Sequence, residues 1–200
     1  MTTFPAYADN FELYPKDGEA AWHLAPLFSS LNRIDFTLSV YDPTVNQGQM
    51  ASDFDTKLEC TLRSGGATPI NLTLPPGVPQ ELDFSFTFCG RNVAVEIEKA
   101  NWEKILRDFL KCHIYLHAGA HFAVVALPRN YAHKHGVWNL FEFGVERYNE
   151  CRTYGFGTAD NLGRILLLGF DQRESATNRL LSKATRAEMR NKAAARLKNT

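Results

Sequence analysis

The chain has 200 residues, of which 44% are hydrophobic, 12% aromatic and 22% charged. This composition is typical of one globular domain with a sizeable core, and it excludes an intrinsically disordered chain. The 22 basic residues balance the 22 acidic ones, so the overall charge does not indicate a nucleic-acid partner. No apolar run approaches the length of a bilayer span and no signal-peptide pattern opens the chain, so we expect a cytoplasmic protein without a membrane partner.

The first third of the chain predicts an extended segment, a helix, a strand and a second helix. Residues 1–17 contain scattered aromatic residues and two prolines, so we expect an extended segment that packs on the domain through its rings. Residues 18–31 are typical of a helix that Pro26 interrupts or bends. Apolar residues alternate over residues 33–42, which predicts a strand. Residues 53–64 favour a short helix that two glycines end.

Residues 81–99 have the pattern of a β-hairpin. LDFSFTF and VAVEIEK each alternate between polar and apolar residues, and CGRN between them supplies the glycine of a tight turn. In the register that we expect, the numbers of paired residues sum to 181. Asp83 then lies opposite Glu98 and Ser85 opposite Glu96 on one face, while the other face is apolar and packs on the core.

The polar face of this hairpin gathers three carboxylates, those of Asp83, Glu96 and Glu98. Carboxylates that face each other across two strands have Cβ atoms about 5 Å apart and repel unless a proton or a cation lies between them. Oxygen ligands of this kind suit Mg²⁺, with Mn²⁺ as a substitute. The alternative is the solvent-exposed face of an ordinary antiparallel hairpin. The helix and apolar strand that follow favour a central strand, and with it the cation site.

Behind the hairpin the chain alternates helices with apolar strands. Asn101 is a candidate helix cap, and the spacing of apolar residues predicts a helix over residues 102–117. Continuous apolar runs predict buried strands over residues 121–128 and 164–171, with a helix over residues 137–151 between them. The solvent-exposed face of the first of these helices is expected to carry Lys104, Arg107, Asp108 and Lys111.

The end of the chain is strongly basic. From Arg173 to Thr200, eight basic residues stand against two acidic ones, a net charge of +6. The stretch is rich in good helix formers, so we expect a basic helix over residues 172–200, appended to a single domain over residues 1–171. Such a helix could lie along DNA phosphates or project from the domain.

The order of these elements resembles the core of the PD-(D/E)xK nucleases. Asp83, a turn, the strand VAVEIEK, a helix and the strand HFAVVALP follow one another as in that superfamily, and the chain is most similar to type II restriction endonucleases of the BamHI and BglII kind. The basic pattern has a lysine two residues after the second acid, whereas Glu98 occupies that position here, as in the BamHI type. Lys99 is one residue out of phase and by alternation points to the opposite face. The resemblance implies an α/β fold with a mixed central sheet flanked by helices.

The resemblance also implies an activity, which is Mg²⁺-dependent hydrolysis of phosphodiester bonds in duplex DNA by a site-specific homodimer. Asp83 and Glu96 would hold the metal, and Glu98 would bind it or act as general base for the attacking water. Glu59, on the upstream helix, is the candidate for a fourth acid at the metal. Candidates for contacts with DNA phosphates are Lys99, Lys104, His133, Lys134, Arg179 and Lys183.

Two other classes of function remain open from the sequence. The first is a catalytically inert DNA-binding relative that keeps the carboxylates in a misformed site. The second is a non-nuclease interaction protein whose acidic face docks a basic partner. The nuclease interpretation requires Asp83, Glu96 and Glu98 to lie close together in space.

Overall fold

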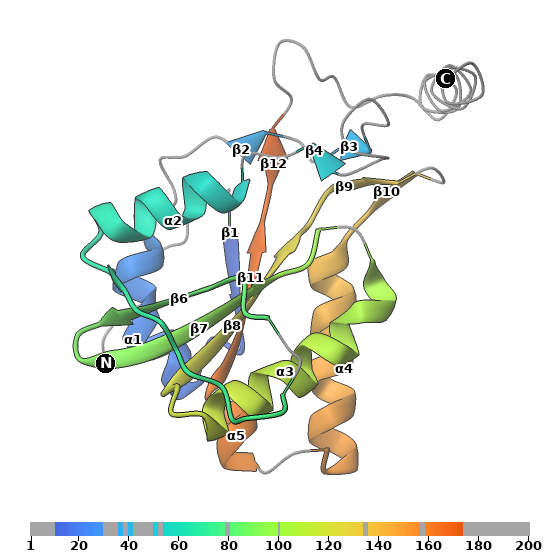
Figure 1. Cartoon of the computed structure of the whole chain (residues 1–200). Helices are drawn as coiled ribbons and strands as arrows, with labels where there is room; N and C mark the ends of the chain where they lie inside the picture. The colour runs from blue at the N-terminus through green and yellow to red at the C-terminus, as the bar shows by residue number, and fades with distance from the viewer. Residues whose placement is uncertain are drawn as a thin grey trace.

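A computed structural model describes residues 11–29, 36–37, 40–41, 50–51, 54–78, 81–99, 101–133, 136–156 and 159–173 (Figure 1). Lys134, Arg179 and Lys183 lie outside these ranges, as does the basic helix expected for the tail. The division into a domain over residues 1–171 and an appended helix therefore stays a prediction. No helix among the described residues is both long and apolar enough to cross a membrane.

A six-stranded mixed sheet forms the centre of the molecule, in the strand order β1-β11-β8-β7-β6-β5. Strands β7, β8 and β11 run parallel to one another. Strand β1 pairs antiparallel with β11, β6 with β7, and β5 with β6. This confirms the predicted α/β fold and the central position of the second hairpin strand. The strands are β1 (Phe11–Tyr14), β5 (Thr68–Pro69), β6 (Phe84–Phe88), β7 (Arg91–Ile97), β8 (Phe122–Pro128) and β11 (Ile165–Phe170).

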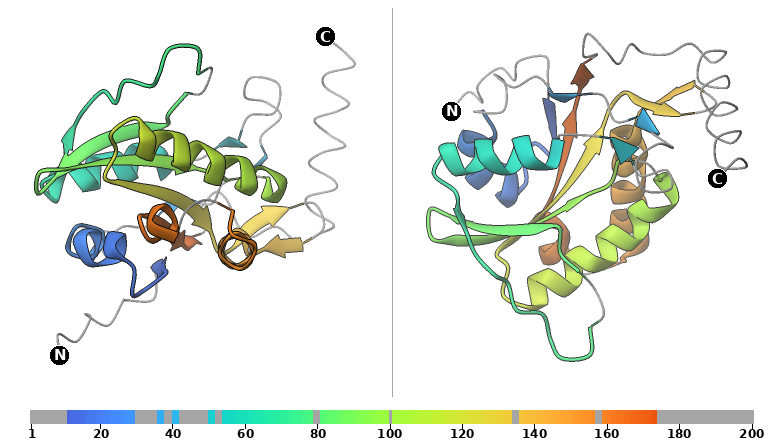
Figure 2. Two further views of the ribbon diagram at one scale, coloured as in Figure 1. Left: turned by 90° about the horizontal axis from the view of Figure 1, so that it is seen from below. Right: turned by 45° about the horizontal axis from the view of Figure 1, so that its top comes forward.

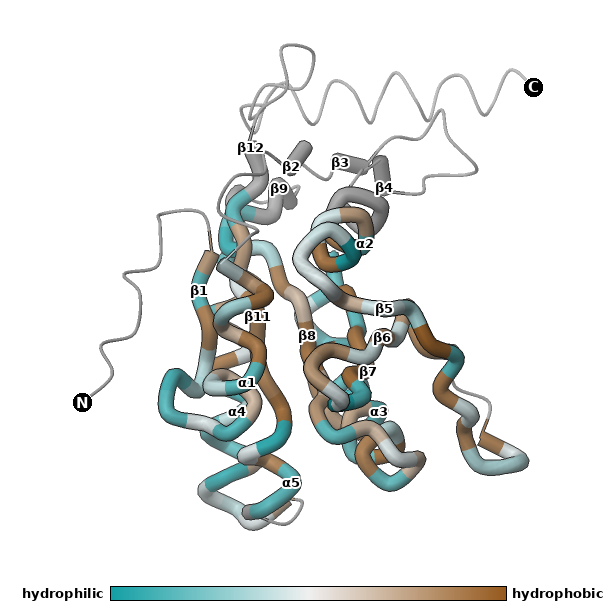
Figure 3. Tube along the Cα trace, turned by 90° about the vertical axis from the view of Figure 1, so that its left-hand side faces the viewer, coloured by the Kyte–Doolittle hydropathy of each residue, from teal (hydrophilic) through white to brown (hydrophobic). Residues whose placement is uncertain are grey.

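Helices cover both faces of this sheet. Figures 1 and 2 show α1 (Glu19–Phe28) and α2 (Phe54–Ser64) on one side of the strands. On the other side lie α3 (Ile105–His117), α4 (Leu140–Tyr154) and the short α5 (Ala159–Gly163). Each side has its own buried apolar cluster, and Figure 3 shows hydrophobic residues along the central strands that separate the two. Strand β8 is buried throughout, as a strand covered on both faces must be.

Several short elements complete the described structure. The strand predicted over residues 33–42 is present as two short pieces with different partners. A single-turn helix, η2 (Trp102–Lys104), precedes α3. The short strand pairs are β2 (Phe36–Thr37) with β12 (Gln172–Arg173), β3 (Val40–Tyr41) with β4 (Met50–Ala51), and β9 (Tyr131–His133) with β10 (Gly136–Trp138).

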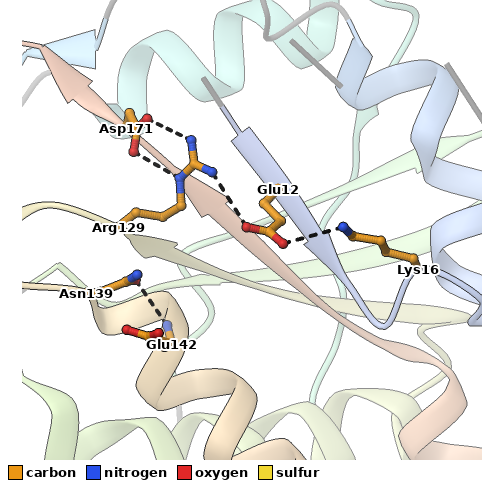
Figure 4. Close-up of polar contacts among 6 residues, drawn as sticks. All are labelled: Glu12, Lys16, Arg129, Asn139, Glu142 and Asp171. Atoms are coloured by element: carbon orange, nitrogen blue, oxygen red, sulfur yellow. Dashed lines mark hydrogen bonds and ion pairs between the residues drawn. The ribbon is translucent and has the colours of Figure 1, made fainter. Parts of the chain in front are cut away.

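Two sequence predictions about element boundaries were wrong. Residues 11–14 form a strand at the sheet edge, antiparallel to β11, and not merely an extended segment. The helix predicted from residue 137 begins at Leu140, because residues 136–138 pair with β9. Asn139 caps this helix, since its side-chain oxygen accepts a hydrogen bond of 3.1 Å from the N–H of Glu142 (Figure 4).

An ionic network ties together the ends of three neighbouring strands. Arg129, directly after β8, donates hydrogen bonds of 2.9 and 2.7 Å to the two carboxylate oxygens of Asp171, directly after β11 (Figure 4). The same guanidinium lies 3.6 Å from Oε2 of Glu12 in β1, and Oε1 of Glu12 lies 3.5 Å from Nζ of Lys16 (Figure 4). The bidentate geometry fixes β8 and β11 in register at this edge.

Candidate active site

The hairpin of β6 and β7 is closed by a two-residue turn. Cys89 and Gly90 have φ angles of 48° and 73°, the left-handed pair that a type I′ turn requires. Phe88 therefore pairs with Arg91, and Ser85 with Ala94, so that paired residue numbers sum to 179. The predicted register was wrong by two residues because it assumed a different turn. A shift of two preserves the faces of both strands, so the apolar and polar sides were assigned correctly.

The corrected register brings Asp83 towards Glu96. Asp83 directly precedes β6, and the pairing continued by one residue places it opposite Glu96 and no longer opposite Glu98. Its Oδ2 accepts a hydrogen bond of 2.7 Å from the backbone N–H of Ile97. This bond fixes the Asp83 carboxylate against the carboxyl end of β7.

Glu96 is the buried acid of the group, with only 3% of its surface exposed. Its Oε1 accepts a hydrogen bond of 2.5 Å from the hydroxyl of Tyr115, and its Oε2 forms an ion pair with Lys111. Burial raises the pKa of Glu96, the two bonds oppose that rise, and the nearby charge of Asp83 adds to it. Burial and the Glu96 carboxylate also raise the pKa of Tyr115, which keeps its hydroxyl protonated and able to donate.

Glu98 lies just beyond β7 and is 8% exposed. Its Oε1 accepts a hydrogen bond of 3.0 Å from the backbone N–H of Asn101. The side chain of Asn101 caps the following turn, accepting a bond of 2.9 Å from the N–H of Glu103. The predicted cap at Asn101 is therefore confirmed, and it fixes the segment that holds Glu98.

Helix α3 contributes polar side chains that the sequence analysis assigned to solvent. Asp108 and Lys111 are 3% and 8% exposed, so their predicted exposure was wrong. Both side chains face the part of the sheet that carries the buried carboxylate of Glu96, with which Lys111 forms an ion pair. Within the described part of the chain, Oδ2 of Asp108 is buried and has no hydrogen-bond partner. Burial, followed by the charges of Glu98 and Glu96, raises the pKa of Asp108 to about 7.

These side chains line one pocket of about 300 Å³ at the carboxyl end of β7. Of the predicted site residues, it brings together the three acids and two lysines. Lys99 reaches the pocket although alternation predicted the opposite face, because the strand ends at Ile97 and its periodicity ends with it. The residues lining the pocket are Asp83, Glu96, Ile97, Glu98, Lys99, Lys104, Arg107, Asp108 and Lys111.

Glu59 is not among the residues that line this pocket. Glu59 lies on α2, which packs against the opposite face of the sheet, and it forms an ion pair of 2.5 Å with Arg63. His133 lies in β9.

The structure is similar to a crystal structure of the restriction endonuclease BGLII in complex with a DNA 16-mer, with a TM-score of 0.54. The fold is restriction-endonuclease-like. The two sequences are 14% identical, and the match covers 87% of this chain and 85% of the other. No protein-family model and no curated protein matches the sequence.

The pocket of this restriction-endonuclease-like fold has the donor chemistry of a site for a hard divalent cation. Among the described residues, no group of three or more His, Cys, Asp or Glu side chains converges as a complete metal site. Mg²⁺ does not need one, because it commonly takes one or two carboxylates and completes its shell with water and substrate phosphates. Burial and the charge of Asp83 both favour the protonated form of Glu96, and Oδ2 of Asp108 has no hydrogen-bond partner among the described residues. A divalent cation bound here would favour the ionised carboxylates.

Proposed function

We propose that this protein is a Mg²⁺-dependent endonuclease that hydrolyses phosphodiester bonds in duplex DNA, and that it is a site-specific enzyme of the type II restriction class. The observation that carries the proposal is the gathering of Asp83, Glu96 and Glu98 around one pocket at the end of a central strand. Open α/β sheets bind their ligands at the carboxyl ends of parallel strands, where this pocket lies. The structurally similar BGLII was crystallised with a DNA 16-mer, which supports DNA as the substrate.

Asp83 and Glu96 are the residues that would hold the cation. When bound, Mg²⁺ would polarise the scissile phosphate and lower the pKa of a coordinated water. Asp83 is oriented by the N–H of Ile97, and Glu96 by Tyr115 and Lys111. Both carboxylates are thus held in place before any ligand arrives, which reduces the reorganisation that binding requires.

Glu98 would act as general base or as a further ligand. As base, its carboxylate takes a proton from a water molecule while the water oxygen forms a bond to phosphorus and the bond from phosphorus to one ester oxygen breaks. The released alkoxide is protonated by solvent. Exposed cationic side chains at the mouth of the pocket, among them Lys104 and Arg107, would steady the incoming phosphates.

Cleavage of a duplex requires two cuts, one in each strand. A chain that contributes one active site can make both if two copies bind a short palindrome related by the same two-fold axis. We therefore propose that the enzyme acts as a homodimer.

The test is cleavage of plasmid DNA with Mg²⁺ by the purified protein and by Asp83→Asn and Glu96→Gln variants. We expect the parent protein to nick or linearise the plasmid, and each variant to lose at least about 100-fold in rate. Glu150→Gln is the matched control, since it removes an exposed carboxylate of α4 that does not line the pocket. An inactive parent protein, or variants that cut like the parent, would refute the proposed function.

One observation favours the inert DNA-binding alternative. Both carboxylate oxygens of Glu96 already bind protein partners, Tyr115 and Lys111. If these bonds exclude the cation, the protein binds duplex DNA without cutting it. Binding to DNA in Ca²⁺, measured by fluorescence anisotropy alongside the cleavage assay, separates the two functions. The interaction-protein alternative predicts neither binding nor cleavage.

A further inference from the structure

The pocket has no surplus of positive charge for a DNA substrate, because its four cationic side chains are matched by four carboxylates. Four carboxylates line it, those of Asp83, Glu96, Glu98 and Asp108. A phosphodiester carries one more negative charge, and the transition state of its hydrolysis places further charge on the phosphoryl oxygens. The position two residues after Glu96, where the basic pattern of such nucleases has a lysine, holds Glu98. A fixed positive charge must therefore come from another part of the chain.

Four cationic side chains line the pocket, and they differ in how firmly the fold holds them. Lys104 and Arg107 are exposed, and Lys99 is half-buried. Lys111 is 8% exposed, and its ammonium contacts the carboxylate of Glu96. A buried charge beside the reacting group acts through a lower effective dielectric than a solvated one, so its effect on the transition state is larger.

Helix spacing explains why Lys111 reaches this position. Lys104, Asp108, Lys111 and Tyr115 follow one another at intervals of four, three and four residues, so they share one face of the helical segment. Tyr115 binds one oxygen of Glu96 and Lys111 binds the other. Glu96 and the ammonium are thus held together as a unit, which fixes the direction of the Lys111 side chain.

We propose that Lys111, on helix α3, is a catalytic residue whose ammonium binds a non-bridging oxygen of the scissile phosphate while it remains paired with Glu96. The proposal rests on the proposed nuclease function. An ammonium has three N–H donors, so one can bind Glu96 and another the phosphate. Lys111 keeps its proton throughout. It stabilises the charge that grows on the phosphoryl oxygen as the water oxygen bonds to phosphorus and the ester bond breaks.

A purely structural Lys111 would have a different signature. If it served only to neutralise Glu96, its removal would leave a buried unpaired carboxylate, displace it, and weaken cation binding. If it is catalytic, its removal takes a like charge away from the cation site. Cation binding should then be unchanged or tighter while cleavage is lost.

The experiment compares the parent protein with Lys111→Met, Lys111→Arg and the control Lys16→Met. Lys16 is an exposed lysine that follows β1, at the opposite edge of the sheet from β6 and β5. Three readouts are needed for each protein: single-turnover cleavage of a plasmid with Mg²⁺, Mn²⁺ affinity by calorimetry without DNA, and duplex affinity by anisotropy in Ca²⁺. Thermal unfolding establishes that each variant is folded.

We expect Lys111→Met to lose about 100-fold or more in cleavage rate, with Mn²⁺ affinity equal to or higher than that of the parent. Lys111→Arg keeps the charge but changes its shape, so it should retain part of the rate. Lys16→Met should match the parent. If Lys111→Met does not fold, the Lys111→Arg variant distinguishes the two roles. A structural role predicts that Lys111→Arg keeps full activity, whereas the catalytic role predicts a reduced cleavage rate with unchanged Mn²⁺ affinity.

The inference is overturned if the parent cuts DNA and Lys111→Met cuts within about threefold of it, or if cleavage and Mn²⁺ affinity fall together. A parent protein that binds Mn²⁺ but cuts no DNA refutes the nuclease function itself, and with it the role of Lys111. The two failures are therefore distinguishable.

Discussion

Asp108 places a carboxyl group in the interior beside those of Glu96 and Glu98, and its raised pKa makes the stability of the fold depend on pH. Its pKa is raised from 3.8 to about 7, first by burial and then by Glu98 and Glu96, while Lys111 and Arg107 oppose the rise. The folded state therefore holds a proton that the unfolded state releases between those pH values. Stability falls as the pH rises from about 4 to about 7, by up to about 4 kcal/mol for this group. The raised pKa of Glu96 acts in the same direction.

We predict that Asp108→Asn removes most of this pH dependence. The amide is uncharged at every pH, so the variant should be more stable than the parent by about 1–3 kcal/mol at pH 7.5 and not at pH 4.5. Urea unfolding at the two pH values measures the difference. Asp160→Asn, an exposed site on α5, is the control and should change neither value by more than about 0.5 kcal/mol. An equal effect of Asp108→Asn at both pH values would contradict the raised pKa.

At the scale of single residues, the sequence located the acids of the pocket but not the partners that position them. Asp83, Glu96 and Glu98 follow from alternation around a turn, which is a local pattern. Asp108 and Lys111 were assigned to solvent, because helical periodicity separates polar from apolar faces and says nothing of a polar surface on the sheet. The sequence did contain a signal. One face of the helical segment carries four polar side chains at helical spacing, and this face lies opposite the acids of the hairpin; the four are Lys104, Asp108, Lys111 and Tyr115.

At the scale of elements, the site depends on the register of β6 against β7. The turn sets that register, and both of its residues have left-handed φ angles. Sequence alone left the turn open, because CGRN allows more than one two-residue or four-residue loop. The faces of the strands were predicted correctly because every one of these registers differs by an even number of residues. The pairing of Asp83 with Glu96 depends on the loop that forms, so it could not be predicted.

We predict that Gly90→Ala destabilises the protein by about 1 kcal/mol through its backbone alone. Gly90 has a φ angle of 73° and no heavy atom within 4 Å of an added Cβ, so the substitution brings strain without a clash. Gly163→Ala is the matched control, because its Cβ also meets nothing within 4 Å and its φ is not left-handed. Chemical unfolding should show a loss for Gly90→Ala and a change below about 0.5 kcal/mol for Gly163→Ala. Equal effects would mean that the turn does not set the conformation of the hairpin.

At the scale of the whole molecule, the mixed sheet followed from the order of elements in the sequence. A hairpin, a helix and further apolar strands predict a mixed sheet with buried central strands, and β7, β8 and β11 pair parallel at its centre. The edge strand β1 was missed because four residues give too short an alternation. Its place is fixed by long-range contacts, namely pairing with β11 and the ion pair of Glu12 with Arg129 (Figure 4).

The stability of the whole molecule should respond to a divalent cation if the pocket binds one. An ion that binds the folded chain and not the unfolded one stabilises it by about 2.7 kcal/mol at 100 times its Kd, which corresponds to a rise in Tm of about 5 °C or more for a chain of this size. We expect Mn²⁺ and Mg²⁺ to produce such a rise in the parent protein and in Glu150→Gln. Glu96→Gln and Asp83→Asn should lose it, because each removes a carboxylate from the pocket. Differential scanning calorimetry with and without each metal measures the shift. If Mn²⁺ leaves the Tm of the parent unchanged, or raises the Tm of Glu96→Gln by the same amount, the acidic pocket does not bind the cation. That result would favour an acidic surface that docks a basic partner.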